Sequence, residues 1–145
     1  MCISPCRKKT RFGEFVDYPC GKCYECVRKR KLDWEIRLSY ALRWSDCAFF
    51  TLLSFDSEHY PDNPFDTKAN VKRVQDFVKR LRKRLCSDYG KDVRLKYFIA
   101  TEFGEEKNRL HYHCCFFLKG VQITWSEFNT LIHSYKVYNF ETDES

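Results

Sequence analysis

The stretch RLHYHCCFF, residues 109–117, places two of the four histidines of the chain one residue apart. Apolar residues alternate along 110–118, which predicts a β-strand, and residues two apart on a strand point to the same face. We therefore expect His111 and His113 to lie side by side, with Tyr112 on the opposite face. Paired imidazoles are common metal ligands. Two partly buried, hydrogen-bonded histidines are the alternative interpretation.

A second alternating segment, residues 93–101, precedes this strand and is joined to it by the polar connection FGEEKNR. If the two strands form a hairpin centred on residues 106–107, Glu102 lies opposite His111 and Ala100 lies opposite His113. Two imidazoles and a carboxylate beside a small residue suit a divalent cation such as Mn²⁺ or Mg²⁺. Such a site leaves positions open for phosphate oxygens.

The N-terminal segment contains a second group of candidate ligands. Cys20, Cys23 and Cys26 form a CxxCxxC motif, and Cys2 and Cys6 lie upstream. Four thiolates make a closed tetrahedral zinc site, while an iron–sulfur cluster and a group of free thiols are the alternatives. The other four cysteines lie in apolar segments, and core packing explains them better; they are Cys47, Cys86, Cys114 and Cys115.

The chain is basic, with 26 Lys and Arg against 20 Asp and Glu, and two blocks are dense in positive charge. Clustered cations attract the phosphates of nucleic acids, although a solvated helix face would look similar. Two such blocks beside a metal-type motif favour DNA binding. The first block (residues 28–31) consists of Arg28, Lys29, Arg30 and Lys31, and the second block (residues 79–84) contributes Lys79, Arg80, Arg82, Lys83 and Arg84.

The elements expected to position these residues are strands and helices in alternation. Residues 27–45 are rich in helix formers and contain no turn signal, so we expect a helix there, although residues 32–40 also alternate as a strand would. Residues 47–55, CAFFTLLSF, are a continuous apolar run of the length expected for a strand buried on both faces.

A second helix is expected after the loop 56–66, ending at Gly90. Its apolar residues recur every three or four positions and should face the core; they are Val71, Val74, Phe77, Val78, Leu81 and Leu85. A short helix at 124–134 opens at Thr124, with Glu127 at capping-box spacing. The order helix, strand, helix, strand, strand, helix predicts an α+β fold with an antiparallel hairpin in its sheet.

These patterns divide the chain into two expected domains. Residues 1–26 should form an irregular, cysteine-rich, zinc-type segment, because proline and glycine interrupt it repeatedly. Residues 27–145 should form the α+β domain. No apolar run approaches the roughly 18 residues of a membrane span, and the N-terminus lacks the apolar region of a signal peptide. We therefore expect a cytosolic protein with no membrane partner.

Three stretches resemble known proteins. YFIATEFGEEKNRLHYHCCFF (97–117) resembles the second motif of HUH endonucleases, and FFTLLSF (49–55) resembles their first motif. PCGKCYECVRKRKLDWEIRL (19–38) is similar to the N-terminal signature of microvirus replication initiation proteins, especially the gokushovirus-like group. The resemblance implies a ferredoxin- or RRM-like antiparallel sheet backed by helices for residues 27–145.

The resemblance also implies an activity. Such proteins initiate rolling-circle replication of single-stranded phage DNA by nicking origin DNA and staying joined to its 5′ phosphate through a tyrosine. It implies Mn²⁺ or Mg²⁺ at Glu102, His111 and His113, and it favours Cys2 as the fourth zinc ligand, with Cys6 as the alternative. The implied partners are single-stranded and origin DNA, with host replication proteins possible, and the implied location is the bacterial cytoplasm.

The catalytic tyrosine is where the sequence departs from the family pattern. That tyrosine lies on a helix after the HxH strand, in a context such as YxxxK, but after His113 the chain contains only Tyr135 and Tyr138. Neither has a lysine four residues later, and YKVYNF looks more like a strand. Tyr138 is slightly favoured over Tyr135, and we expect the nucleophile to lie beyond Ser145. The alternative function is a nucleolytically inactive single-stranded DNA-binding module of the same fold.

Overall fold

The computed structural model describes residues 1–105 and 108–133. It divides into two compact units, Met1–Tyr40 and Ala41–Ser145. The division falls inside the first helix rather than after Cys26, where the composition of the sequence changes. In the described part of the chain, no helix combines the length and the apolar character needed to cross a membrane.

The first unit contains a β-hairpin that the sequence patterns did not reveal. Strands β1 (Cys6–Lys9) and β2 (Phe15–Tyr18) pair antiparallel. The expectation of irregular structure over residues 1–26 was therefore wrong. Both strands are exposed along their whole length. They lack the alternation of apolar and polar residues by which a half-buried strand is recognised.

Helix α1 (Tyr24–Trp44) begins in the first unit and ends in the second. The helix predicted over 27–45 is confirmed, and the alternating apolar residues within it do not indicate a strand. None of its residues is buried. This explains the ambiguity of the pattern, because a helix without a buried face need not display a stripe of 3.6-residue period.

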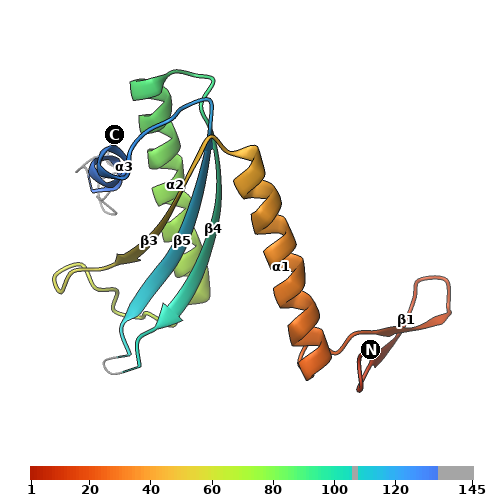
Figure 1. Ribbon diagram of the computed structural model, residues 1–145. Coiled ribbons are helices and arrows are strands. Elements are labelled where there is room, and N and C mark those ends of the chain that lie inside the picture. Colours follow the sequence, from red (N-terminus) through yellow and green to blue (C-terminus); the bar gives the residue numbers. More distant parts are fainter. Residues whose placement is uncertain (106–107, 134–145) are drawn as a thin grey trace. The chain divides into compact units, whose positions relative to one another are not determined.

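The second unit is built on a three-stranded antiparallel sheet of order β3-β5-β4. Its strands are β3 (Cys47–Ser54), β4 (Arg94–Phe103) and β5 (Leu110–Lys119), and Figure 1 shows β5 between its two neighbours. The hairpin of β4 and β5 has the predicted register, with Glu102 opposite His111 and Ala100 opposite His113. The α+β class with antiparallel pairing is therefore confirmed.

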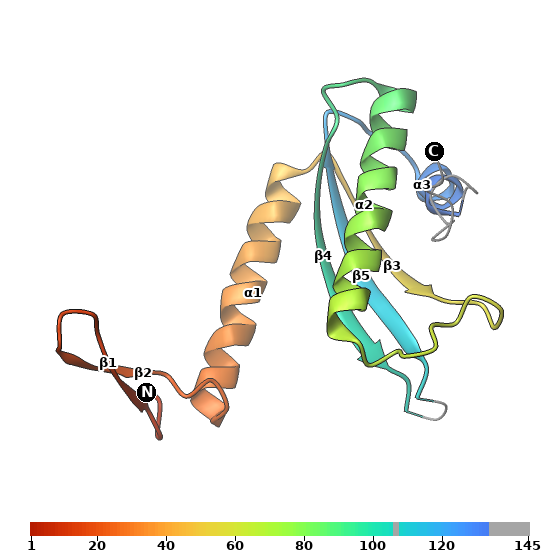
Figure 2. The ribbon, with the colours of Figure 1, turned by 180° about the vertical axis from the view of Figure 1, so that it is seen from behind.

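Two helices cover one face of this sheet. Helix α2 (Thr67–Tyr89) runs along that face in Figures 1 and 2, and α3 (Trp125–Ile132) packs beside it. The shared core contains Phe77 and Leu81 of α2, Phe116 of β5, and Phe128 of α3. Phe128 also stacks on Phe49 of β3, with ring centroids 4.3 Å apart. The sheet and these helices thus form two layers around one core.

Sequence signals at the helix ends are confirmed. Gly90 caps α2, with a positive φ of 103° and its N–H donating to the carbonyl of Cys86. At the start of α3, Thr124 and Glu127 form the predicted capping box. These local signals were readable because a cap depends on few neighbouring residues.

Two expectations about burial were wrong. Strand β3 is not buried on both faces: it lies at the edge of the sheet, and Phe50 on its uncovered face is 64% exposed. The apolar run failed to indicate this because both faces of β3 carry apolar residues. Val71, expected in the core stripe of α2, is 51% exposed, whereas Phe77, Val78, Leu81 and Leu85 are buried as predicted.

Candidate metal centres

The face of the sheet opposite α2 carries the first candidate metal centre. Glu102 projects from β4, and His111 and His113 project from β5. One carboxylate oxygen, Oε2 of Glu102, lies 2.7 Å from Nε2 of His113 and 3.8 Å from Nε2 of His111. The donor atoms of all three residues lie within 4.8 Å of one another, so this group can hold a metal ion.

The His111 ring is oriented by its own strand. Its Nδ1 lies 3.2 Å from the backbone carbonyl oxygen of Arg109. A carbonyl only accepts hydrogen bonds, so Nδ1 donates and Nε2 keeps its lone pair facing Glu102 and His113. Metal-binding histidines are usually fixed through the second ring nitrogen in this manner. The donor set therefore fits a divalent cation.

Arg109 and Tyr60 hold the loop after β3 against the end of β5 that carries His111. The guanidinium of Arg109 donates to the carbonyl of Phe55 at 2.9 Å and lies over the Tyr60 ring. The Tyr60 hydroxyl accepts a hydrogen bond from the backbone N–H of Leu110 at 2.9 Å. Sequence reasoning did not single out these two residues, because their partners are about 50 residues away in the chain.

The open side of the site is bordered by apolar residues of β3. Phe50 stacks beside the His113 ring, with ring centroids 6.0 Å apart, and Leu52 is the cross-strand partner of His113. Both side chains are exposed. Glu102 itself is 57% exposed, so a ligand can reach the donor atoms from this face. The assignment of residues 47–55 to a fully buried strand concealed this apolar border.

Tyr112, between the two histidines, points to the opposite face as predicted. It is buried beside Phe55 in the core under α2. Burial raises the pKa of its hydroxyl. Its position on the covered face of the sheet removes it from consideration as a nucleophile at the metal centre.

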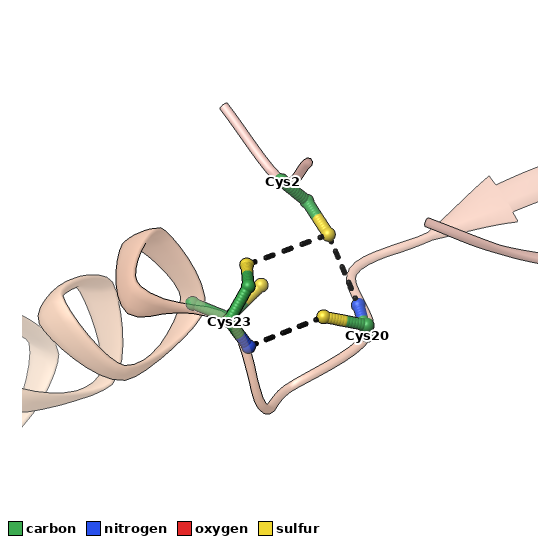
Figure 3. Close-up of side chains that lie close together, drawn as sticks. Cys2, Cys20 and Cys23 are labelled. Atoms are coloured by element: carbon green, nitrogen blue, oxygen red, sulfur yellow. Dashed lines mark hydrogen bonds between the residues drawn. The ribbon is translucent and has the colours of Figure 1, made fainter. Parts of the chain in front are cut away.

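The second candidate metal centre lies in the first unit. The sulfur atoms of Cys2, Cys20, Cys23 and Cys26 lie within 4.8 Å of one another. Figure 3 shows three of these side chains converging, with Sγ of Cys2 3.9 Å from Sγ of Cys23. The backbone N–H of Cys20 donates to the Cys2 sulfur at 3.3 Å, and that of Cys23 donates to the Cys20 sulfur at 3.4 Å. Backbone N–H groups pointing at sulfur are suited to thiolates.

The four thiols differ in acidity. Backbone hydrogen bonds from Ile3 and Cys26 lower the pKa of Cys23 to about 6. A backbone hydrogen bond at Gly21 favours the Cys26 thiolate as well, but desolvation and the sulfurs of the other three cysteines together raise its pKa to about 12. All four thiolates can therefore form near neutral pH only with a cation among them, which fits the chemistry of a tetrahedral metal site.

The remaining cysteines are separate from this group. Cys6, the alternative fourth ligand, lies on β1 and is exposed outside the cluster. Cys114 is fully buried in the core, where desolvation raises the pKa of its thiol to about 12. Cys47, Cys86 and Cys115 are partly buried. Core packing therefore accounts for Cys114 as predicted, and for part of the surface of the other three.

The first basic block lies on α1 close to the cysteine cluster. Arg30 donates to the carbonyl of Gly21 at 3.0 Å, and Arg28 pairs with Glu25 at 3.2 Å. Lys29 and Lys31 are exposed. The block thus combines two residues that stabilise the unit with two lysines available to a ligand.

The second basic block lies on α2, in the layer that covers the face of the sheet opposite the Glu102 site. Several of its cations already have partners within the unit: Arg84 pairs with Asp88 at 2.6 Å, and Arg82 donates to the Leu95 carbonyl at 3.2 Å. Arg80 is partly buried, while Lys79 and Lys83 are exposed. A role of this block in DNA binding stays a prediction, and it would involve a different side of the unit from the metal centre.

The two candidate nucleophiles, Tyr135 and Tyr138, lie outside the described residues. Their assignment stays a prediction from the sequence.

Fold and donor groups together define a mixed α/β chain with antiparallel sheets and two groups of residues that can hold metal ions. The chain belongs to the replication-associated protein ORF2 family, whose sequence profile matches residues 47–143. This match confirms the recognition of a phage replication protein that was based on residues 19–38, 49–55 and 97–117.

Individual relatives agree with this assignment. The chain is 32% identical to the replication-associated protein ORF4 of Chlamydia phage 1, in a match that covers 68% of this chain and 23% of that protein. It is 30% identical to the replication-associated protein ORF2 of Spiroplasma virus 4, over 68% of this chain and 31% of that protein. The replication-associated protein VP4 of Bdellovibrio phage phiMH2K is 28% identical, over 69% of this chain and 31% of its own length.

The matches thus span between a quarter and a third of these relatives. No solved structure matches the chain.

Proposed function

We propose that this chain carries the metal centre of a replication initiation protein that nicks and rejoins origin DNA of a small single-stranded DNA phage, for rolling-circle replication. The observation that carries the proposal is the convergence of Glu102, His111 and His113 on an open sheet face. Family membership supports a role in replication, because the relatives are replication-associated proteins of phages.

The residues around the centre would each have a distinct task. Glu102, His111 and His113 would hold Mn²⁺ or Mg²⁺, which supplies charge that polarises a phosphate in the transition state. The Arg109 carbonyl would keep His111 in the binding tautomer. Phe50, exposed beside His113, would support the base next to the scissile phosphate by stacking.

The proposed reaction is a transesterification by a tyrosine. The phenol oxygen attacks phosphorus and loses its proton, a bond forms between tyrosine and the 5′ phosphate, and the 3′ oxygen leaves and takes up a proton. The freed 3′-hydroxyl would prime synthesis by host replication proteins. Tyr138 and Tyr135 are the candidates from this chain, and the reverse reaction would rejoin the ends.

We propose zinc for the site of Cys2, Cys20, Cys23 and Cys26, because four thiolates in a closed group favour a structural zinc ion. Its task would be to stabilise a unit in which no residue is buried. We further propose that the second unit has the HUH endonuclease fold, a variant of the ferredoxin- or RRM-like sheet. The proposed place of action is the cytoplasm of the bacterial host.

The test measures whether the centre couples Mn²⁺ to DNA. Mn²⁺ should raise the melting temperature of the chain, because a ligand at 100 times its Kd stabilises the native state by about 2.7 kcal/mol. It should also tighten binding of a single-stranded oligonucleotide from the phage origin, measured by fluorescence anisotropy. In His113→Ala both effects should disappear.

His59→Ala is the matched control, because His59 is an exposed histidine of the loop 56–66 that pairs with Asp56 and belongs to neither donor group. It should respond to Mn²⁺ as the parent chain does. A His113→Ala chain that keeps the full Mn²⁺ response would rule out this centre.

A further inference from the structure

We propose that the β1–β2 hairpin is a binding site for single-stranded nucleic acid, formed by Lys9, Arg11, Phe12 and Phe15. The inference goes beyond the metal-dependent reaction, because it concerns the first unit alone and needs no ion at Glu102, His111 and His113.

Charge is the first observation. Residues 1–40 contain ten Lys and Arg against five Asp and Glu, a net charge of +5 out of +6 for the whole chain. The attraction for a phosphate backbone is therefore concentrated in the first unit. Arg7 is bound by Asp17 through two hydrogen bonds of 2.9 and 3.2 Å, whereas the residue opposite Lys9 on the hairpin is an aromatic one, Phe15.

The second observation is the pairing of cations with exposed aromatic rings. Lys9 and Phe15 are cross-strand partners, so their side chains lie on one face of the ribbon. At the tip, the Arg11 guanidinium lies 4.7 Å from the centroid of the Phe12 ring. Phe12 is 77% exposed and Phe15 is 67% exposed. Twice, therefore, a ring on which a base can stack lies next to a cation that can contact the adjoining phosphate.

These rings do not serve a core in their own unit. None of residues 1–40 is buried, so Phe12 and Phe15 stabilise the unit by packing only to a small extent. Alternating cation and aromatic groups on an open ribbon are the arrangement by which proteins bind single strands, since every base offers a face for stacking. Bases within a duplex are already stacked on each other, so they would not reach these rings.

The ribbon is held in one conformation at both ends. At the tip, the N–H of Thr10 donates to the Glu14 carbonyl at 2.7 Å, and Gly13 takes a positive φ of 87° to close the turn. At the base, Cys2 precedes β1 and Cys20 follows β2, and the N–H of Cys20 donates to the Cys2 sulfur. A site built on a fixed ribbon loses little conformational entropy when it binds.

The experiment uses the full chain in a His113→Ala background without added Mn²⁺, so that the proposed metal centre does not contribute. Anisotropy of a labelled oligothymidylate of roughly 16 nucleotides measures binding. Phe12→Leu and Phe15→Leu should each weaken it about tenfold, because they remove the stacking surface and keep an apolar side chain. Phe12→Trp and Phe15→Trp should retain affinity.

A second arm tests the cations through salt dependence. In the double variant Lys9→Gln, Arg11→Gln, the slope of log affinity against log salt should fall by about 1.4, at about 0.7 for each phosphate contact to a single strand. Lys91→Gln is the control, because Lys91 is exposed in the turn after α2. It should leave the slope unchanged.

Three results would overturn the proposal. Leucine variants that bind as the parent does would exclude stacking on these rings. Equal losses in the leucine and tryptophan variants would show a structural role instead. Tighter binding to a duplex of the same length would exclude the single strand as the ligand. Far-UV circular dichroism and metal content confirm that each variant keeps its fold.

Discussion

At the scale of single residues, both donor groups combine side chains with backbone groups that prepare them. The Arg109 carbonyl orients His111, and the N–H groups of Cys20 and Cys23 point at sulfur atoms. Such partners determine which protonation state of a ligand is favoured, and hence how readily it takes a cation. The metal chemistry of this protein therefore depends on residues beyond the ligands themselves.

The cysteine group yields a prediction with an internal control. We expect about one zinc ion per chain by elemental analysis, and its loss in Cys23→Ser together with the structure of the first unit. Cys6→Ser should keep its zinc, because Cys6 is exposed on β1 outside the group. Iron with visible absorbance, or a parent chain without metal, would contradict the zinc assignment.

Acid should release this zinc. The pKa of Cys23 is lowered to about 6 by backbone hydrogen bonds from Ile3 and Cys26, so its thiolate persists down to that pH even before a metal adds its own charge. Protons compete with the metal for thiolates, and metal affinity therefore falls as the pH is lowered.

At the scale of elements, the central place of β5 determines the geometry of the Glu102 site. Pairing on both sides fixes the register of this strand, and a slip by one residue would turn His111 and His113 toward the core. The buried residues on its other face, among them Leu110, Cys114 and Phe116, oppose such a slip. The core under α2 therefore holds the histidines on the open face.

The start of α3 allows a second prediction at this scale. The hydroxyl of Thr124 accepts a hydrogen bond from the Glu127 N–H, and the Glu127 carboxylate accepts one from the Thr124 N–H. Thr124→Ala should lower the free energy of unfolding by about 1 kcal/mol, within a usual range of about 0.5 to 2. Urea unfolding measures this loss.

Thr130→Ala is the control for the cap, since the Thr130 hydroxyl donates to the Ser126 carbonyl inside the same helix. It should change the stability by less than about 0.5 kcal/mol. Equal effects of both replacements would mean that the cap contributes nothing specific. The backbone hydrogen bond from Thr124 lowers the pKa of Glu127, so this contribution is present at neutral pH and is lost as the pH falls through the lowered pKa.

At the scale of the whole molecule, charge and chemistry are assigned to different units. The first unit holds most of the net positive charge, and the second holds the Glu102 site. This division suggests that affinity for DNA and action on its phosphate can be removed separately, by changes in the hairpin and at His113.

The last prediction concerns the covalent step. With Mn²⁺ and an origin oligonucleotide, we expect this 145-residue chain to bind without forming a covalent adduct, because neither Tyr135 nor Tyr138 has the tyrosine–lysine spacing of the resembled family. A denaturing gel provides the measurement. An adduct that disappears in Tyr135→Phe or Tyr138→Phe would contradict this expectation and identify the nucleophile.

The sequence by itself determined what depends on short range. Alternation along β5 and a symmetric hairpin were enough to place Glu102 opposite His111, because the period of a strand assigns each residue to a face. The caps at Gly90 and Thr124 were predictable for the same reason. The spacing of Cys20, Cys23 and Cys26 indicated a metal group, although the sequence left its fourth ligand open between Cys2 and Cys6.

Tertiary structure alone decided which faces are covered and which distant residues meet. The apolar run of β3 could not reveal that β3 lies at an edge with Phe50 exposed, because burial depends on where α2 packs. The β1–β2 hairpin escaped notice because strands without a covered face carry no periodic pattern. Only the folded chain brings Cys2 rather than Cys6 to the other three sulfurs, because that choice depends on how the hairpin closes at its base.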